Sequence, residues 1–391
     1  LIMSRNRVIY QSEGLYVSKD ASVTGASDHE QLNRIQSANY SFTINRQDVN
    51  QFGDLARIDS LVLEPPTVSL DFSYYLADGF NERSLGFFVQ TTGSGMNKGL
   101  PDTNGVSAIG NFASGQLLAS SGSNFYIVTS PEGQDLNKST SGEALNDNDS
   151  VIGVGNCYLS DYSVDLSVGS LPTVSVTVEG SNMNSSTGAL AGTIISPAIN
   201  QESGTAYTAS GVSLPNPTIN GGITGSTGSA PITALRPGDV TLDLTSIDGV
   251  SLVKLDGSDG AHIQSASISL PLSRTPIDRL GSRFPFAREV DFPVSATLNV
   301  SAIVAESQQA NLADLLNSGV QEASILVKDA AGSPAIQFRM KGLKVDSQSF
   351  SSSIGSNKSV DITFSTQIGG PNDEINGLFM SGINGSNKVF S

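Results

Sequence analysis

The chain has 391 residues, which is enough for two or three domains at roughly 100–200 residues per domain. It carries 37 acidic and 21 basic residues, a net charge of −16, and this surplus argues against a surface that binds nucleic-acid phosphates. An acidic wall past which a polyanion slides is still permitted. Gly, Ser, Thr and Asn are abundant, Trp is absent and long helical patterns are scarce, so we predict a mainly β protein.

The single cysteine, Cys157, excludes an internal disulfide framework and is most simply a small buried apolar residue. No run of about 18 apolar residues predicts a transmembrane helix. The first seven residues lack the apolar core of a signal peptide. We therefore expect an intracellular product with no membrane contact.

Alternating hydrophobic residues predict the strands in chain order. The clearest are 8–10, 14–17, 35–45, 67–76, 163–178, 240–244, 250–255 and 349–364, of which 163–178 and 349–364 each contain a Gly/Ser turn between two strands. The Asp248-Gly249 pair is a strong hairpin signal. Short helices are expected at 81–89 and at 306–317, where three leucines, Leu312, Leu315 and Leu316, share one face before the stop at Gly319.

The chain repeats itself. Ile35-Gln36-Ser37-Ala38 returns as Ile263-Gln264-Ser265-Ala266, and the same offset of 228 residues relates Gly53 to Gly281 and Pro65 to Pro293. Segment 163–178 is echoed by 349–364 at an offset of 186. The alternative reading is the general likeness of all sandwich proteins. We predict a first β-domain at 1–180, a Gly/Ser/Thr/Pro-rich insertion or linker at 181–235 and a second β-domain at 236–391.

The residues give no catalytic, cofactor or metal site. His29 and His262 are far apart, and one cysteine matches no nucleophile pattern. The glycine-rich stretch 92–95 lacks the lysine of a phosphate-binding loop. The acidic turn 146–149 lacks the glycine and distal glutamate of a calcium loop. We therefore expect a protein that is not an enzyme and has no cofactor.

Two segments carry a family resemblance. Ser41 to Gly53 leads from a strand into an Arg46-Gln47-Asp48 bend, and Leu63 to Leu76 runs from a Glu-Pro step into an alternating strand. Together with residues 10–18 they resemble the major tail proteins of long-tailed bacteriophages. The match is good over about the first 90 residues. It is weaker in the second copy, where Pro276 and Asp278 stand in place of Asp48 and Asn50.

The resemblance implies a tandem pair of β-sandwich or partial-barrel domains, each with one short flanking helix. It also implies a structural virion protein, assembled in the host cytoplasm, that forms the tail tube through which DNA is ejected. The rings of that tube stack, and a duplicated domain implies a homotrimer with pseudo-sixfold symmetry. The implied partners are further copies of the chain, other tail proteins (tape measure, terminator and distal tail) and double-stranded DNA that passes without specific binding.

A net negative lumen follows from the charge and from the need for DNA to move without sticking. The candidate lumen-facing acids are four loop residues, Asp135, Glu143, Asp147 and Asp149. The alternatives are another virion structural protein or a receptor-binding adhesin built of tandem sandwiches. An adhesin should show aromatic clusters for sugar binding, yet only 6% of the residues are aromatic and Trp is absent. A third class is a secreted polysaccharide hydrolase, which needs paired carboxylates, but no signal peptide supports secretion.

Overall fold

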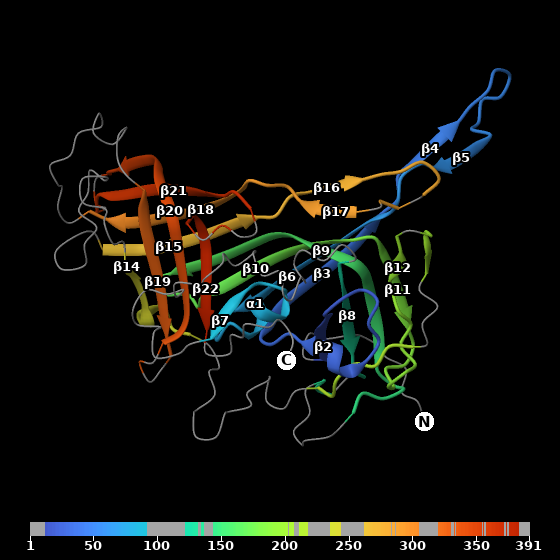
Figure 1. Ribbon diagram of the computed structural model, residues 1–391, viewed down its shortest axis with the longest axis horizontal. Helices are drawn as coiled ribbons and strands as arrows, with labels where there is room; N and C mark the ends of the chain where they lie inside the picture. The colour runs from blue at the N-terminus through green and yellow to red at the C-terminus, as the bar shows by residue number, and fades with distance from the viewer. Residues whose placement is uncertain are drawn as a thin grey trace.

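The computed structural model describes residues 12–91, 122–217, 235–243, 262–304 and 320–382, apart from gaps at 132–133, 137–143, 202, 207–210, 283, 286, 330–331, 333, 354, 356, 371–372 and 374. Strands dominate the described chain, so the expected mainly β class is confirmed (Figure 1). The helix expected at 81–89 is α1 (Phe80–Ser84). The helix expected at 306–317 lies outside the described residues. No described helix is long and apolar enough to span a membrane.

The strands form two sets that follow each other in the same order. The first set is β1 (Glu13–Ser18), β3 (Ile35–Thr43), β4 (Arg46–Val49), β5 (Asp59–Val62), β6 (Thr67–Tyr75), β8 (Ser123–Thr129), β9 (Ser150–Ser167), β10 (Thr173–Gly180) and β11 (Asn182–Ser186). The second set is β14 (Val240–Asp243), β15 (His262–Pro271), β16 (Arg274–Ile277), β17 (Ala287–Val290), β18 (Val294–Ile303), β19 (Gln321–Lys328), β20 (Pro334–Ser351), β21 (Ser359–Ile368) and β22 (Gly377–Gly382). The short strands β2 (His29–Gln31), β7 (Val89–Thr91), β12 (Ile199–Asn200) and β13 (Thr205–Ala206) have no counterpart in the described part of the other set.

Both sets contribute the same four-stranded order to one continuous sheet. The first contributes β9-β10-β6-β3 and the second β20-β21-β18-β15, and β15 pairs with β9 where they meet. The registers agree as well, because Ser37 lies opposite Ser73 and Ser265 lies opposite Ser301. Each first strand has a register shift at the same place, just before these serines. The strand order and the registers thus follow the offset of 228 residues seen in the sequence, and the two copies share a sheet.

Turn glycines support the same correspondence. Gly53 and Gly281 both adopt a positive φ, of 101° and 87°, at the tips of the β4–β5 and β16–β17 hairpins. Gly169 and Gly355 do so in the turns after β9 and β20, with φ of 87° and 90°. Only glycine adopts this left-handed backbone at little cost, so the same turn chemistry was kept in both copies.

Each copy is a sandwich whose two layers are joined by one long strand. β9 and β20 have 18 residues each. The first part of β9 pairs with β8 and β11, and its last part pairs with β10 and β15. β20 likewise pairs first with β19 and β22 and then with β21. A strand that changes layers in this way closes a core without a second connection.

The core lies between the layers and runs through both copies. In β10 the alternate residues Val174, Val176 and Val178 are buried, and in β18 Ala296, Leu298 and Val300 are buried. These side chains belong to one hydrophobic cluster that includes residues of both sets. The period of two thus places one face of the sheet on the core and the other face outward.

The described part of the predicted insertion packs on the first copy. β11 pairs with β9 and is the counterpart of β22, so the first copy extends to Ser186, beyond the predicted boundary at 180. Further on, Ile194 forms a bridge with Val212, and both are fully buried in a second small cluster with Tyr16 and Tyr126. This segment is therefore part of the folded first copy where it is described.

The two hairpins that follow β3 and β15 lie in different surroundings. The β16–β17 hairpin lies against β9 and β10, where Arg274 and Arg288 stand over the ring of Tyr158 at 5.0 and 5.7 Å. The β4–β5 hairpin projects from the body at the upper right of Figure 1. Its fully exposed residues include Phe52 and Leu55.

Candidate functional site on the open face of the sheet

The face of the long sheet that points away from the core is polar along its whole length. Its outward positions are held largely by Ser, Thr, Asn and Asp, for example Ser69, Asp71 and Ser73 in β6 and Ser265, Ser267 and Ser269 in β15. We call this surface the open face; it comprises the outward residues of β3, β6, β10, β15, β18, β21, the last part of β9 and the last part of β20. Alternation of polar and apolar residues positions every one of these side chains.

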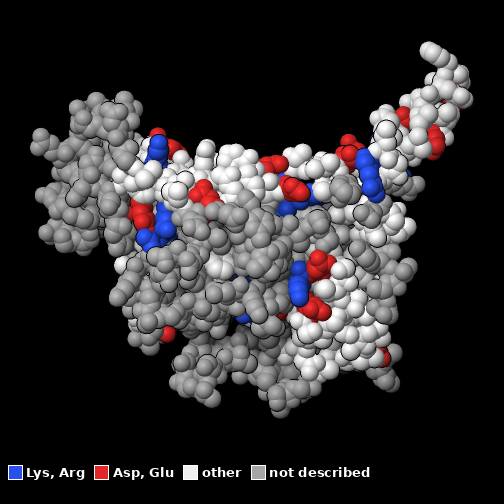
Figure 2. Space-filling model, viewed as in Figure 1, with Lys and Arg blue, Asp and Glu red and all other residues white. Residues whose placement is uncertain are grey.

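The charges on the open face are mainly negative. Its acids are Asp71, Asp161, Asp165 and Glu179 in the first copy and Asp361 in the second. No Lys or Arg occurs in β3, β6, β10, β15, β18, β21 or residues 158–167 of β9. Lys344 and Asp346 lie together on β20, the outermost strand of the second copy's four. Figure 2 shows how sparse charged side chains are on the described surface in that view, where uncharged residues predominate.

Hydrogen bonds between neighbouring strands hold these polar side chains in place. The Thr177 hydroxyl donates to the Asp71 carboxylate at 2.7 Å, and its counterpart Thr363 donates to Asn299 at 2.9 Å. The hydroxyls of Ser37 and Ser73 lie 2.7 Å apart across β3 and β6. Bonds between side chains of neighbouring strands therefore fix several of the polar groups of the open face.

The charge of two of these acids is influenced by neighbouring groups. Partial burial between β10 and β15 raises the pKa of Asp161. Glu179 lies 3.9 Å from the Arg288 guanidinium of the β16–β17 hairpin, the closest approach of a basic group to it among the described ion pairs. Asp165, in the first copy, and Asp361, in the second, are exposed. Asp71 and Glu179 are exposed as well, so these four acids carry the negative charge of the open face into solvent.

Three of the four loop acids expected to face a lumen are described, and none of these three is on the open face. Asp135 and Asp147 are exposed but belong to loops beside the other layer, and Glu143 lies outside the described residues. Asp149 is fully buried just before β9; it accepts hydrogen bonds from the Ser130 hydroxyl at 2.8 Å and from the Asn146 amide at 2.9 Å. Asp149 is thus a structural carboxylate of a turn, and the prediction for it is corrected.

The histidines and the cysteine considered in the sequence lie at separate places in the fold. His29 is buried, its Nδ1 lies 2.7 Å from the Gly25 carbonyl, and burial lowers its pKa. Burial raises the pKa of the Cys157 thiol well above its ordinary value. His262 is exposed at the start of β15. Among the described residues, no three His, Cys, Asp or Glu side chains are grouped to hold a metal ion.

One buried carboxyl group was not anticipated. Glu82 in α1 is fully buried beneath the sheet, where it accepts hydrogen bonds from the hydroxyls of Tyr74 at 2.8 Å and Tyr162 at 3.3 Å. Burial raises the pKa of Glu82 to about 7, against the hydrogen bonds that lower it. Nothing in the sequence marked it, because Tyr162 comes from a strand 80 residues away.

Glu82 makes the stability of the first copy depend on pH. Its folded pKa of about 7 exceeds its ordinary value of 4.5, so its protonated form favours folding and stability falls as pH rises from 4.5 to 7. The loss is about 3 kcal/mol at 1.36 kcal/mol per pKa unit. Glu82→Gln keeps an acceptor for both tyrosines and cannot ionise. Urea unfolding at pH 5 and pH 8 should therefore show the variant gaining about 2.5 kcal/mol relative to wild type between the two values, because part of the change lies below pH 5.

Glu64 supplies the control for this measurement. It is an exposed carboxylate that accepts a hydrogen bond from Asn45 at 3.1 Å. Glu64→Gln should follow the wild-type stability at both pH values, since an exposed acid contributes little. Parallel pH curves for wild type and Glu82→Gln would contradict the assignment of the buried proton.

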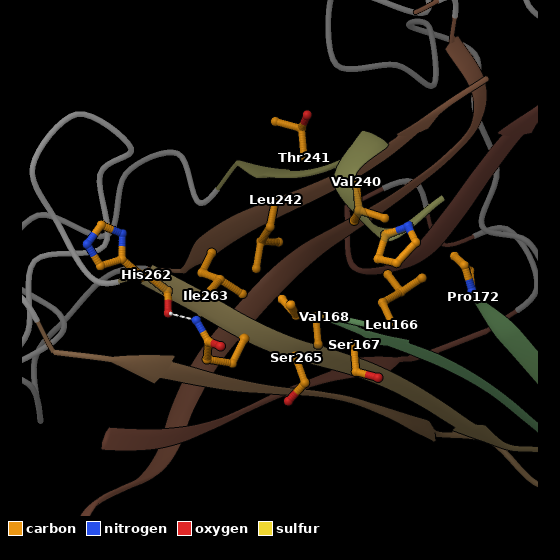
Figure 3. A pocket seen from close by; sticks show the side chains of 13 residues that line it. Leu166, Ser167, Val168, Pro172, Val240, Thr241, Leu242, His262, Ile263 and Ser265 are labelled. Atoms are coloured by element: carbon orange, nitrogen blue, oxygen red, sulfur yellow. Dashed lines mark hydrogen bonds between the residues drawn. The ribbon is translucent and has the colours of Figure 1, made fainter. Parts of the chain in front are cut away.

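A pocket of about 350 Å³ lies where the two copies meet, between β9, β14 and β15 (Figure 3). Figure 3 shows Leu166, Leu242 and Ile263 on its walls and His262 at one end. His262 is the one ionisable side chain among its lining residues. The pocket therefore brings together no acid–base pair and no nucleophile with a base.

Comparisons with known proteins give no family for the chain. No protein-family model matches it. No curated protein matches it significantly. A type VI secretion system effector from Yersinia pestis aligns with 36% of this chain and 96% of its own length at 10% identity, with a TM-score of 0.19. The baseplate of the anti-feeding prophage aligns with 37% and 92% at 14% identity, with a TM-score of 0.22. At these TM-scores the likeness supports no argument about fold or function.

Proposed function

We propose that the chain is a non-enzymatic structural protein of a bacteriophage tail and that it forms the tail tube, a hollow conduit for DNA. The observation that carries the proposal is the open face. Two copies of one strand framework share a continuous sheet, and its outward side is Ser/Thr-rich and acidic, without Lys or Arg in most of its strands. The motif resemblance of residues 41–76 to major tail proteins points to the same role.

The open face suits the wall of a channel for a polyanion. A wall that bound phosphates would release counterions at every ring and hold the DNA in place. A hydroxyl that already donates to a neighbouring carboxylate, as Thr177 does to Asp71, offers a phosphate little. Exposed acids such as Asp165 and Asp361 repel DNA only over the screening distance of about 8–10 Å at physiological salt. DNA would therefore pass without sticking.

Two copies in each chain make three chains sufficient for six equivalent positions around a ring. We propose that such trimers, with pseudo-sixfold symmetry, stack to form the tube within the virion tail. The proposed partners are further copies of this chain and the other tail proteins at the two ends of the tube. The acids that line the lumen are, in this proposal, those of the open face in place of the four loop acids.

Light scattering and negative-stain electron microscopy of the purified chain test the proposal together. We expect a species with the mass of three 40.6 kDa chains and images of rings or tubes with a central hole. A monomer at all concentrations, or elongated trimers with a distinct tip, would contradict it. The second result would favour a receptor-binding protein.

A further inference from the structure

The contact between the two copies shows how one copy binds the next. β15 of the second copy pairs antiparallel with the last part of β9 of the first, with Ser269 opposite Ser163 and Ile268 opposite Val164. On the core side of this contact Ile268, Leu270 and Leu272 are fully buried. The contact joins the end strand β15 of one four-stranded set to the long strand β9 of the other, so it is head-to-tail and leaves one unmatched edge at each end.

The unmatched edges are β3 and the last part of β20. In the described chain β3 pairs only with β6, and residues 344–351 of β20 pair only with β21. Three core-side residues of the β3 edge, Tyr40, Phe42 and Ile44, are 37%, 57% and 39% exposed. Their counterparts at the internal contact are Ile268, Leu270 and Leu272, each 0% exposed.

The β20 edge shows the same difference. Phe350 is 42% exposed, whereas its counterpart Val164 is fully buried at the internal contact. The two registers agree around these residues, because Val174 lies opposite Val164 in β9 and Val360 lies opposite Phe350 in β20. Both edges therefore carry large apolar side chains at the positions that the internal contact covers.

We propose that β3 of one chain pairs antiparallel with the last part of β20 of a second copy, in the register of the internal β15–β9 contact. The internal register, transferred through the repeat, places Ser41 opposite Ser349, Tyr40 opposite Phe350 and Asn39 opposite Ser351. A second copy is the partner because its edge is the one that completes this pairing. The inference rests on the proposed ring and specifies the contact between its chains, the β3–β20 pairing, which we call the seam.

The base of the β4–β5 hairpin extends the seam. At the internal contact the Leu272 amide donates to the Ser160 carbonyl at 2.8 Å, and Val290 of β17 is only 7% exposed. The counterpart of Val290 is Val62 of β5, which is 48% exposed. The backbone amide of Ile44 is thus expected to donate to the Asp346 carbonyl of the second copy. The second copy would then cover the side chain of Val62.

The seam between chains differs from the internal contact in one respect. Inside the chain, Arg274 and Arg288 stack on Tyr158, and Arg288 also approaches Glu179. The positions corresponding to Arg288, Tyr158 and Glu179 are Ser60, Lys344 and Ser365. The stacked cation–π contacts therefore have no equivalent between chains. The inter-chain seam therefore lacks a stabilising contact that the internal one has.

Disulfide trapping tests the proposed register. In the full chain, Ser41→Cys with Ser349→Cys should link neighbouring chains under mild oxidation and give covalent oligomers up to a closed ring on a non-reducing gel. The matched internal pair, Ser163→Cys with Ser269→Cys, has the same place in the repeat and should link within one chain. Asn39→Cys with Ser347→Cys is shifted by four residues, about 13 Å, and should link at least about tenfold less.

The outcomes separate the seam from the function. Inter-chain links at Ser41 and Ser349 support the seam. Rings seen by microscopy without these links overturn the proposed register and leave the ring function standing. Links in assemblies that have no central hole support the seam and overturn the tube function. Links in the shifted pair equal to those in the Ser41 pair also overturn the register. A chain that stays monomeric, with the internal pair linked, overturns both proposals.

Discussion

Phe42→Asp should abolish assembly of the chain while leaving the single protomer folded. Phe42 is 57% exposed at the edge of β3, so an aspartate there remains in contact with water in the monomer. In the proposed seam the same position is covered, as its counterpart Leu270 is at 0% exposure. An unpaired charge buried there weakens the association of two chains by several kcal/mol, and a closed ring has one such charge at every inter-chain contact. Sedimentation would report monomers, and circular dichroism would report unchanged melting.

Ile195 provides the matched control for this experiment. Its side chain is also 57% exposed, but it belongs to the segment after β11 and lies away from both edge strands. Ile195→Asp should assemble as the wild type does. Rings formed by Phe42→Asp at wild-type concentrations would show that β3 is not in the seam, whereas loss of assembly in both variants would point to a general loss of folding.

Reversing charge on the open face should convert an inert channel wall into one that retains DNA. Asp165→Lys with Asp361→Lys changes one exposed acid in each copy, and neither residue takes part in the proposed seam. Rings of this variant should still form. They should bind duplex DNA with an affinity that falls steeply with salt, because each added phosphate contact releases a counterion. Wild-type rings should show no measurable binding at physiological salt.

A second double variant separates position from net charge. Asp135→Lys with Asp147→Lys makes the same change in charge at exposed loops off the open face. Its rings should bind DNA no more than the wild type does, when both are compared by fluorescence anisotropy across a salt series. Equal DNA binding by the two double variants would remove the open face from the proposed channel.

The strands were predictable because the alternation of apolar and polar residues and the repeated motifs can both be read from short stretches of sequence. Ile35-Gln36-Ser37 and Ile263-Gln264-Ser265 even contain the same register shift, so the offset of 228 residues holds in space. The joining of β15 to β9 was not predictable, since no local pattern says which edges meet. The first copy also extends through β11, where the Ser/Asn-rich sequence resembled a linker.

The candidate site was missed for a related reason. Acids in the loop around Asp147 stood out by composition, whereas Asp71, Asp165 and Asp361 lie within segments predicted as strands and drew no attention. The alternation of the strands did contain the information. Each of these acids stands between two buried apolar residues, so its side chain must point outward once the apolar face is assigned to the core. The environment of Glu82 had no such signal, since its partners come from β6 and β9 and meet only in the folded chain.

The most direct test of the proposed tube is a cryo-electron-microscopy reconstruction of the assembled chain. We predict rings of three chains in which β3 of each pairs with β20 of the next, so that the sheets close around a channel lined by Asp165, Asp361 and the other residues of the open face. Rings of six chains, or rings in which the open face points outward and Lys and Arg line the channel, would contradict the account.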